Sequence, residues 1–148
     1  MIVQIENDVD LFFVCSLIDF IGRQTKNDRK VIVNAIGEDG IRHIYDFADV
    51  LHSENIEEVS DRIINQYAIK NGEFDNVAEC EYHIPTFWDI GKVYMRLIIM
   101  VGGDRVRTLI DIYNSWIADK INNYNIAVYF MSPEYIYECY KEGEILED

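Results

Sequence analysis

Apolar residues recur along most of the chain with the period of an amphipathic helix, and several of these stretches begin at a capping residue or end at a glycine. The first stretch is apolar on nearly all sides, which predicts a central position in the fold. Together the stretches predict seven helices, over residues 8–24, 28–36, 39–52, 55–67, 86–101, 104–122 and 132–143.

Two segments depart from this pattern. Residues 68–85 form an extended polar connection. Residues 126–130 read IAVYF, a composition typical of a short strand, which we expect to pair with the N-terminal MIVQI. The prediction is an all-α fold, a compact bundle of about six or seven short to medium helices, with room for a minor two-stranded ribbon.

Length and composition predict one domain that spans residues 1–148. Hydrophobic residues make up 49% of the chain, enough to build a core. The three cysteines form no CxxC pair, and no secretion signal follows Met1. The longest apolar run, 97–101, is too short to cross a bilayer. We therefore expect a cytoplasmic protein that is not embedded in a membrane.

The charge is strongly acidic, with 27 Asp and Glu against 13 Lys and Arg and a net charge of −14. Direct binding to nucleic acid or to an anionic membrane draws on clustered cations, which are scarce here. The balance favours a basic protein partner or mimicry of nucleic acid. It leaves the oligomeric state open.

Aromatic and acidic residues crowd the C-terminal part of the chain, a composition typical of a protein-binding surface. An equally favoured alternative is that the tyrosines only dock the last helix on the core. The candidate partner-binding residues are Trp116, Tyr129, Tyr137, Glu134, Glu138 and Glu142.

A catalytic role is less favoured but open. His83 lies near Asp89 and Tyr82 in the sequence, and a histidine beside a carboxylate can act as a general base. A plain surface histidine in a loop is the favoured alternative, and no Ser, Thr or Cys carries a nucleophile motif.

No metal or cofactor is expected. The pairs His43/Asp46 and Asp49/His52 lie on opposite sides of one predicted helix, so they cannot form one metal site. The glycines at 102–103 lack the residues of a phosphate-binding loop. One local cluster of positive charge reads as a solvated turn rather than a docking site, and its members are Arg23, Lys26, Arg29 and Lys30.

Three stretches, Val31 to His52, Phe87 to Ile98 and Tyr113 to Ile145, resemble a group of uncharacterised small bacterial proteins. Members of that group tend to be encoded beside other short domains of unknown function, including toxin-like ones. The resemblance implies a toxin–antitoxin or mobile-element setting, in which small acidic proteins often neutralise a basic partner.

Three functional hypotheses follow. The first is a non-catalytic acidic protein-binding module, such as an antitoxin or regulator, that neutralises a basic partner. The second is an acidic decoy of nucleic acid that inhibits a DNA-binding protein. The third is a small enzyme with a site near His83.

Overall fold

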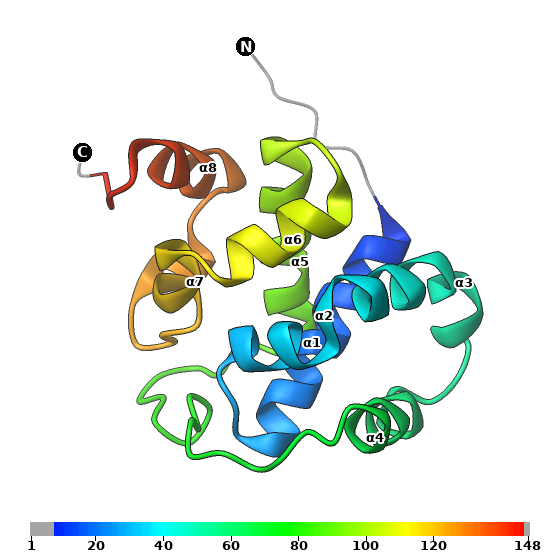
Figure 1. Cartoon of the computed structure of the whole chain (residues 1–148). Coiled ribbons are helices and arrows are strands. Elements are labelled where there is room, and N and C mark those ends of the chain that lie inside the picture. The colour runs from blue at the N-terminus through cyan, green and yellow to red at the C-terminus, as the bar shows by residue number, and fades with distance from the viewer. Residues whose placement is uncertain (1–7, 147–148) are drawn as a thin grey trace.

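The computed structural model describes residues 8–146, in which short links join most successive helices and one long connection spans residues 67–86 (Figure 1). No strand occurs within these residues, and the predicted compact all-α bundle is confirmed. The elements in chain order are α1 (Val9–Thr25), α2 (Arg29–Asp46), α3 (Ala48–Leu51), α4 (Ile56–Gln66), α5 (Phe87–Val101), α6 (Arg105–Tyr113), α7 (Trp116–Ile121), the 3₁₀-helix η1 (Ala127–Phe130) and α8 (Pro133–Glu142).

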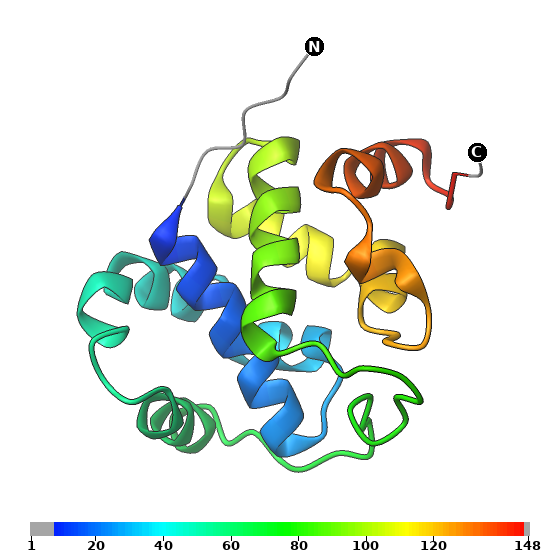
Figure 2. The ribbon, with the colours of Figure 1, turned by 180° about the vertical axis from the view of Figure 1, so that it is seen from behind.

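Helices α1 and α5 cross at the centre of the bundle (Figures 1 and 2). As predicted, α1 is buried on most of its surface. The two helices approach closely at Gly91, where an added Cβ would lie 2.2 Å from Ser16 Oγ and 2.8 Å from Ser16 N. Helices α2 and α6 cover one side of this pair, α3 and α4 pack on α1, and α8 packs on α5.

The helix ends follow the caps in the sequence. Thr86 and Asp89 form the expected capping box at the start of α5. Ser132 caps α8, Pro133 is its first residue, and Gly143 ends it with φ 78°. Gly37, with φ 77°, kinks α2 between the two helices predicted for 28–36 and 39–52.

The helix predicted for 104–122 is broken into α6 and α7. Asn114 Nδ2 donates to the carbonyl of Ile110, and Ser115 Oγ donates to that of Ile112. These side chains compete with the main chain for the carbonyls that would continue the helix. The chain therefore turns at Asn114 and starts again at Trp116.

The strand predicted for Ile126–Phe130 is wrong. Residues 127–130 form η1, which buries Val128 in the core and turns the chain toward α8. Strand propensity reflects packing on a sheet, and the described residues offer no sheet to pair with. The proposed partner segment, MIVQI, lies outside the described residues.

The solvated turn expected around Arg29 is also wrong. The Arg29 side chain is fully buried, and its Nε donates to Asp19 Oδ1 at 2.8 Å. Arg23 Nε donates to the other oxygen of this buried carboxylate, also at 2.8 Å. Burial lowers the pKa of Arg29, but the charge of Asp19 and the hydrogen bonds to Asp19 and Tyr124 outweigh it, so the net pKa is raised and the guanidinium stays charged. Lys26 and Lys30 are exposed, as expected.

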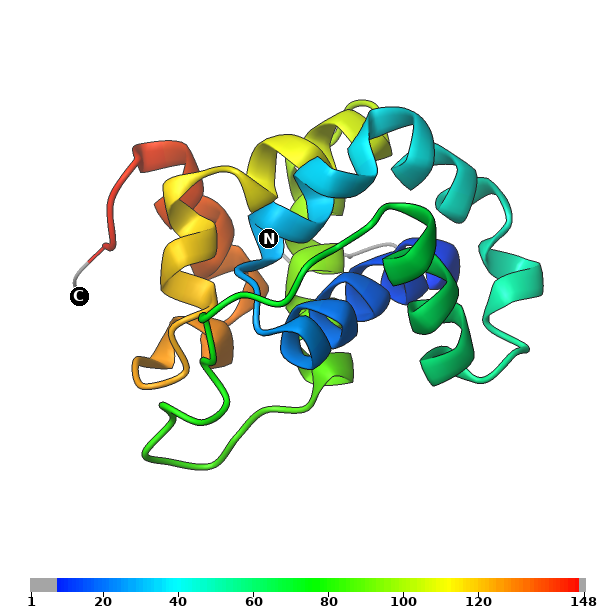
Figure 3. The same cartoon turned by 60° about the horizontal axis from the view of Figure 1, so that its bottom comes forward.

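The polar connection between α4 and α5 packs across the junction of α1 and α2 (Figure 3). The amides of Gly72 and Phe74 donate to the carbonyls of Thr25 and Lys26, each at 2.8 Å. Asn76 Oδ1 accepts from Arg29 Nη2 at 3.0 Å. No helix in residues 8–146 is long and apolar enough to cross a membrane.

We predict that Arg29→Met lowers the free energy of unfolding by about 3 kcal/mol or more, because it leaves part of the buried Asp19 carboxylate unpaired. Arg42→Met is the matched control, since Arg42 pairs with Asp104 on the surface and its loss changes stability far less. Urea denaturation measures the free energy of unfolding of both variants. An equal decrease in the two would contradict a special role of the buried ion pair in stability.

We also predict that stability falls as the pH rises above about 10, the ordinary pKa of tyrosine. Tyr94 and Tyr113 are stacked at 4.0 Å and fully buried, and burial raises the pKa of each well above that value. Above pH 10 the unfolded chain loses phenolic protons that the folded chain keeps, so alkali favours unfolding. Tyr113→Phe removes one such group and should reduce the slope of stability against pH. The free energy of unfolding is measured by urea titration at several alkaline pH values. If its slope against pH is the same in the variant, the buried tyrosines are not the cause of the loss.

Candidate functional site

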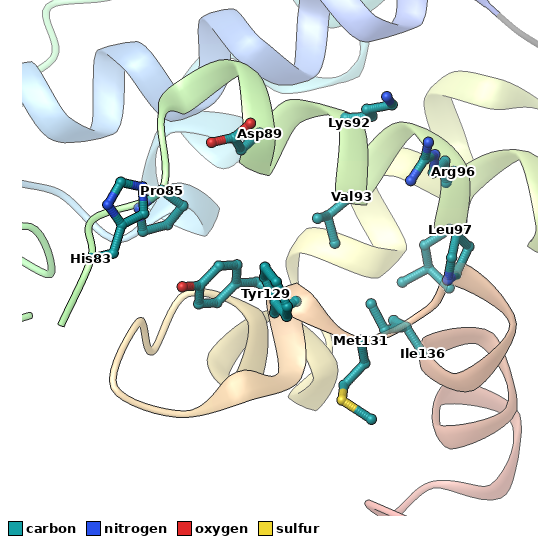
Figure 4. A pocket seen from close by; sticks show the side chains of 12 residues that line it. His83, Pro85, Asp89, Lys92, Val93, Arg96, Leu97, Tyr129, Met131 and Ile136 are labelled. Atoms are coloured by element: carbon teal, nitrogen blue, oxygen red, sulfur yellow. The ribbon is translucent and has the colours of Figure 1, made fainter.

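A groove of about 400 Å³ lies between α5 and the segment that contains η1 and α8 (Figure 4). We call it the α5–α8 groove. Its lining residues come from the end of the polar connection, from one face of α5, from the η1 segment and from the start of α8. They are His83, Pro85, Asp89, Lys92, Val93, Arg96, Leu97, Tyr129, Phe130, Met131, Pro133 and Ile136.

The α5 wall is one stripe of a helix. Asp89, Lys92, Val93, Arg96 and Leu97 recur at spacings of three and four residues, so they share a face. Leu97 is buried beneath the groove, and Val93 points toward Tyr129 across it (Figure 4). The stripe is therefore apolar toward the core and charged toward solvent.

The opposite wall is aromatic and apolar. Tyr129 packs its ring edge-on to Tyr124, with centroids 5.9 Å apart, and contacts Phe130 in the same way at 6.2 Å. Phe130 is 82% exposed, and Met131 is 40% exposed. Ile136, on the first turns of α8, is buried at the end of this wall.

The His83 end of the groove is fixed by hydrogen bonds from the bundle. Arg23 Nη2 donates to the Pro85 carbonyl at 2.7 Å and to Tyr124 Oη at 3.2 Å. The amide of Glu81 donates to Asn125 Oδ1, and Asn125 Nδ2 donates to the Glu79 carbonyl. These bonds join the connection before α5 to the turn before η1.

The α5 wall of the groove carries two cations, Lys92 and Arg96. Neither Lys92 nor Arg96 has a carboxylate within ion-pair distance among residues 8–146. They lie one helical turn apart, and both line the groove (Figure 4). This is a local positive surface on a strongly acidic chain.

The structure brings His83 and Asp89 to the same groove, whereas Tyr82 is 69% exposed and lies outside its lining. Asp89 Oδ2 already accepts a hydrogen bond from the Thr86 amide at 2.9 Å, as part of the helix cap. No Ser, Thr or Cys belongs to the described lining, so the groove holds no hydroxyl or thiol nucleophile of that kind. Its composition is that of a binding site, and catalysis at His83 stays a prediction.

The candidate partner-binding residues lie on three segments, α7, η1 and α8. Tyr129 lines the groove, while Trp116 is half-buried against the core at the start of α7. Tyr137 packs against Lys141, whose Nζ lies 4.7 Å from the ring centroid. The remaining three are exposed on α8, on the side away from Ile136: Glu134, Glu138 and Glu142.

Sequence reasoning named His83, Asp89 and Tyr129 as candidates but not the other residues that line the groove. Lys92 and Arg96 alternate with Val93 and Leu97 on one helix stripe, a pattern that was readable. The exposure of Phe130 was not readable, since it depends on the direction in which η1 leaves the core.

A second hollow of about 370 Å³ is polar and lies beside the buried Arg29 network. Asp28, Glu79 and Asp119 contribute carboxylates to it, and Asn76 and Asn122 line it. No group of three or more His, Cys, Asp or Glu in the described part of the chain is arranged to hold a metal ion.

Comparisons of the chain with family models, with curated proteins and with solved structures found no match.

We predict that the main role of the Asp89 side chain is to cap the N-terminus of α5. Asp89→Ala and Thr86→Ala should each lower the free energy of unfolding by about 1 kcal/mol, because each removes one half of the capping box. The double variant should lose less than the sum, since the two bonds belong to one turn. Glu79→Ala is the control on the same side of the molecule. Denaturation curves that show no loss for Asp89→Ala would contradict this role.

Proposed function

We propose that the protein is a non-catalytic protein-binding module, an antitoxin-like protein or regulator that neutralises a basic partner. The interface in this proposal is the surface of the η1 segment and the outer face of α8. The observation that carries the proposal is the 82% exposure of Phe130 at the edge of an apolar groove.

The exposed side chains around Phe130 are of the kinds that are common at protein–protein interfaces. Ile126 and Met131 are 37% and 40% exposed beside it along the chain, and Tyr129 lies under it. Aromatic residues and Met are enriched at protein interfaces, where they fill pockets of the partner. A large apolar side chain gains free energy when a partner removes it from water, which favours a protein partner at this surface.

The charge around this surface favours a basic partner. Glu134 and Glu142 are exposed on α8 and have no cation within ion-pair distance in the described residues. Most other described acids are also without an ion pair, so the net charge of −14 is not neutralised locally. Such a field accelerates association with a positive protein surface.

We predict that Phe130→Ala weakens partner binding by about 2 kcal/mol, roughly thirtyfold, without loss of stability, because the side chain makes little contact within the fold. Phe47→Ala is the matched control, since Phe47 is 50% exposed at the junction of α2 and α3. The measurement is capture of basic proteins from native lysate by each tagged variant at low and moderate salt, followed by titration of the captured protein.

A basic protein that is retained by the Phe47 variant and lost by the Phe130 variant supports the proposal. Equal capture by both variants would refute the proposed interface. Capture that is independent of Phe130 and disappears at moderate salt would instead indicate a charge decoy.

A further inference from the structure

The α5–α8 groove has the size and lining of a small-molecule site. Its volume of about 400 Å³ lies in the range of ligand pockets, which are mostly apolar with a few polar groups that fix orientation. The apolar lining is continuous across both walls: Val93 and Leu97 from α5, and Tyr129, Met131 and Ile136 from the facing segment. An aliphatic or aromatic body therefore finds apolar contacts on two sides.

Arg96 differs from every other arginine of the chain. Each of the others lies within 4.0 Å of a carboxylate: Arg23, Arg29, Arg42, Arg62, Arg105 and Arg107. Arg96 has no such partner among residues 8–146, although the chain has 27 acids against 13 bases. Lys92, one turn earlier on the same wall, is equally unpaired. The two unpaired cations thus lie where a ligand in the groove would carry its charge.

We propose that the α5–α8 groove binds a small amphipathic carboxylate. Its apolar body lies between Val93 and Tyr129, and its carboxylate is held by Arg96 and Lys92. The planar guanidinium fork matches a carboxylate with two parallel hydrogen bonds. This site goes beyond the proposed protein interface and does not depend on the identity of a protein partner.

A single negative charge fits the groove better than a phosphate dianion. Asp89 is on the same stripe as Lys92, so a second negative charge on the ligand would face a carboxylate. The rest of the chain carries a strong negative field, which opposes a dianion more than a monoanion. His83 lies at the far end of the groove, beyond Asp89 (Figure 4).

The test uses three probes with the same eight-carbon chain and different head groups: octanoate, octanol and octylammonium. Binding to the full chain is followed by calorimetry and by NMR shifts of the methyl groups of Val93, Leu97, Met131 and Ile136. We expect octanoate to bind and shift these methyl groups, octanol to bind more weakly, and octylammonium to bind least.

Variants of the two cations test whether Arg96 and Lys92 are the groups that bind the carboxylate of octanoate. We expect Arg96→Gln to weaken octanoate binding by about tenfold or more, since a hydrogen bond to a charged group is lost. Lys92→Gln should weaken it less, and Arg96→Lys should restore part of the binding because it keeps the charge. Lys120→Gln is the matched control: Lys120 is exposed on α7, is unpaired among the described residues and lies outside the lining.

The proposal fails if octanoate shows no saturable binding to the groove, or if the three probes bind alike. It also fails if Lys120→Gln weakens octanoate binding as much as Arg96→Gln does, since selection would then come from net charge. Lys92 is exposed, so its variant tests the proposal even if Arg96→Gln disturbs the fold.

Discussion

The Asp19 carboxylate, buried in the middle of the bundle, is the group on which the arrangement of the chain depends. It lies on α1 and binds two arginines, Arg23 one turn later and Arg29 at the start of α2. Such a pair adds little net stability, because the desolvation of two charges offsets their attraction. We infer that its main effect is to fix positions, since the two oxygens of Asp19 bind arginines from different parts of the chain. Arg29 extends this constraint to the polar connection by donating to Asn76.

The same network determines where the α5–α8 groove opens. Arg23 reaches past Asp19 to the Pro85 carbonyl and to Tyr124, so the chain before α5 and the chain before η1 are held together. At the other end, α8 packs on α5 and buries Ile136. Residues 126–131 span the distance between these two points of attachment. They do not close onto Val93, and the space that remains is the groove.

The sequence was informative at most helix ends, where structure depends on neighbours along the chain. The cap at Thr86, the Pro133 and Gly143 ends of α8 and the kink at Gly37 all follow from local backbone chemistry. The sequence was misleading where tertiary contacts decide. Arg29 looked solvated because all of its side-chain partners lie ten or more residues away, and only the Asn27 carbonyl is near it in the sequence. His83 and Asp89 are close in the sequence and line the same groove, but the wall that makes their surroundings concave comes from residues 129–136, whose position no local pattern encodes.

The contrast between Arg29 and Arg96 links the fold to the proposed binding site. An acidic chain has carboxylates in excess, so an arginine that forms no ion pair is held apart by the geometry of its helix rather than by any shortage of partners. Asp89 precedes Arg96 by seven residues on the same stripe, and its carboxylate is already bound at the Thr86 cap. Seven residues are about two helical turns, so Asp89 lies beyond the i,i+3 and i,i+4 spacings at which side chains pair on a helix. The Arg96 guanidinium, which has no carboxylate partner among residues 8–146, lies beside an apolar surface that stays open, and these are the two features that an amphipathic anion needs.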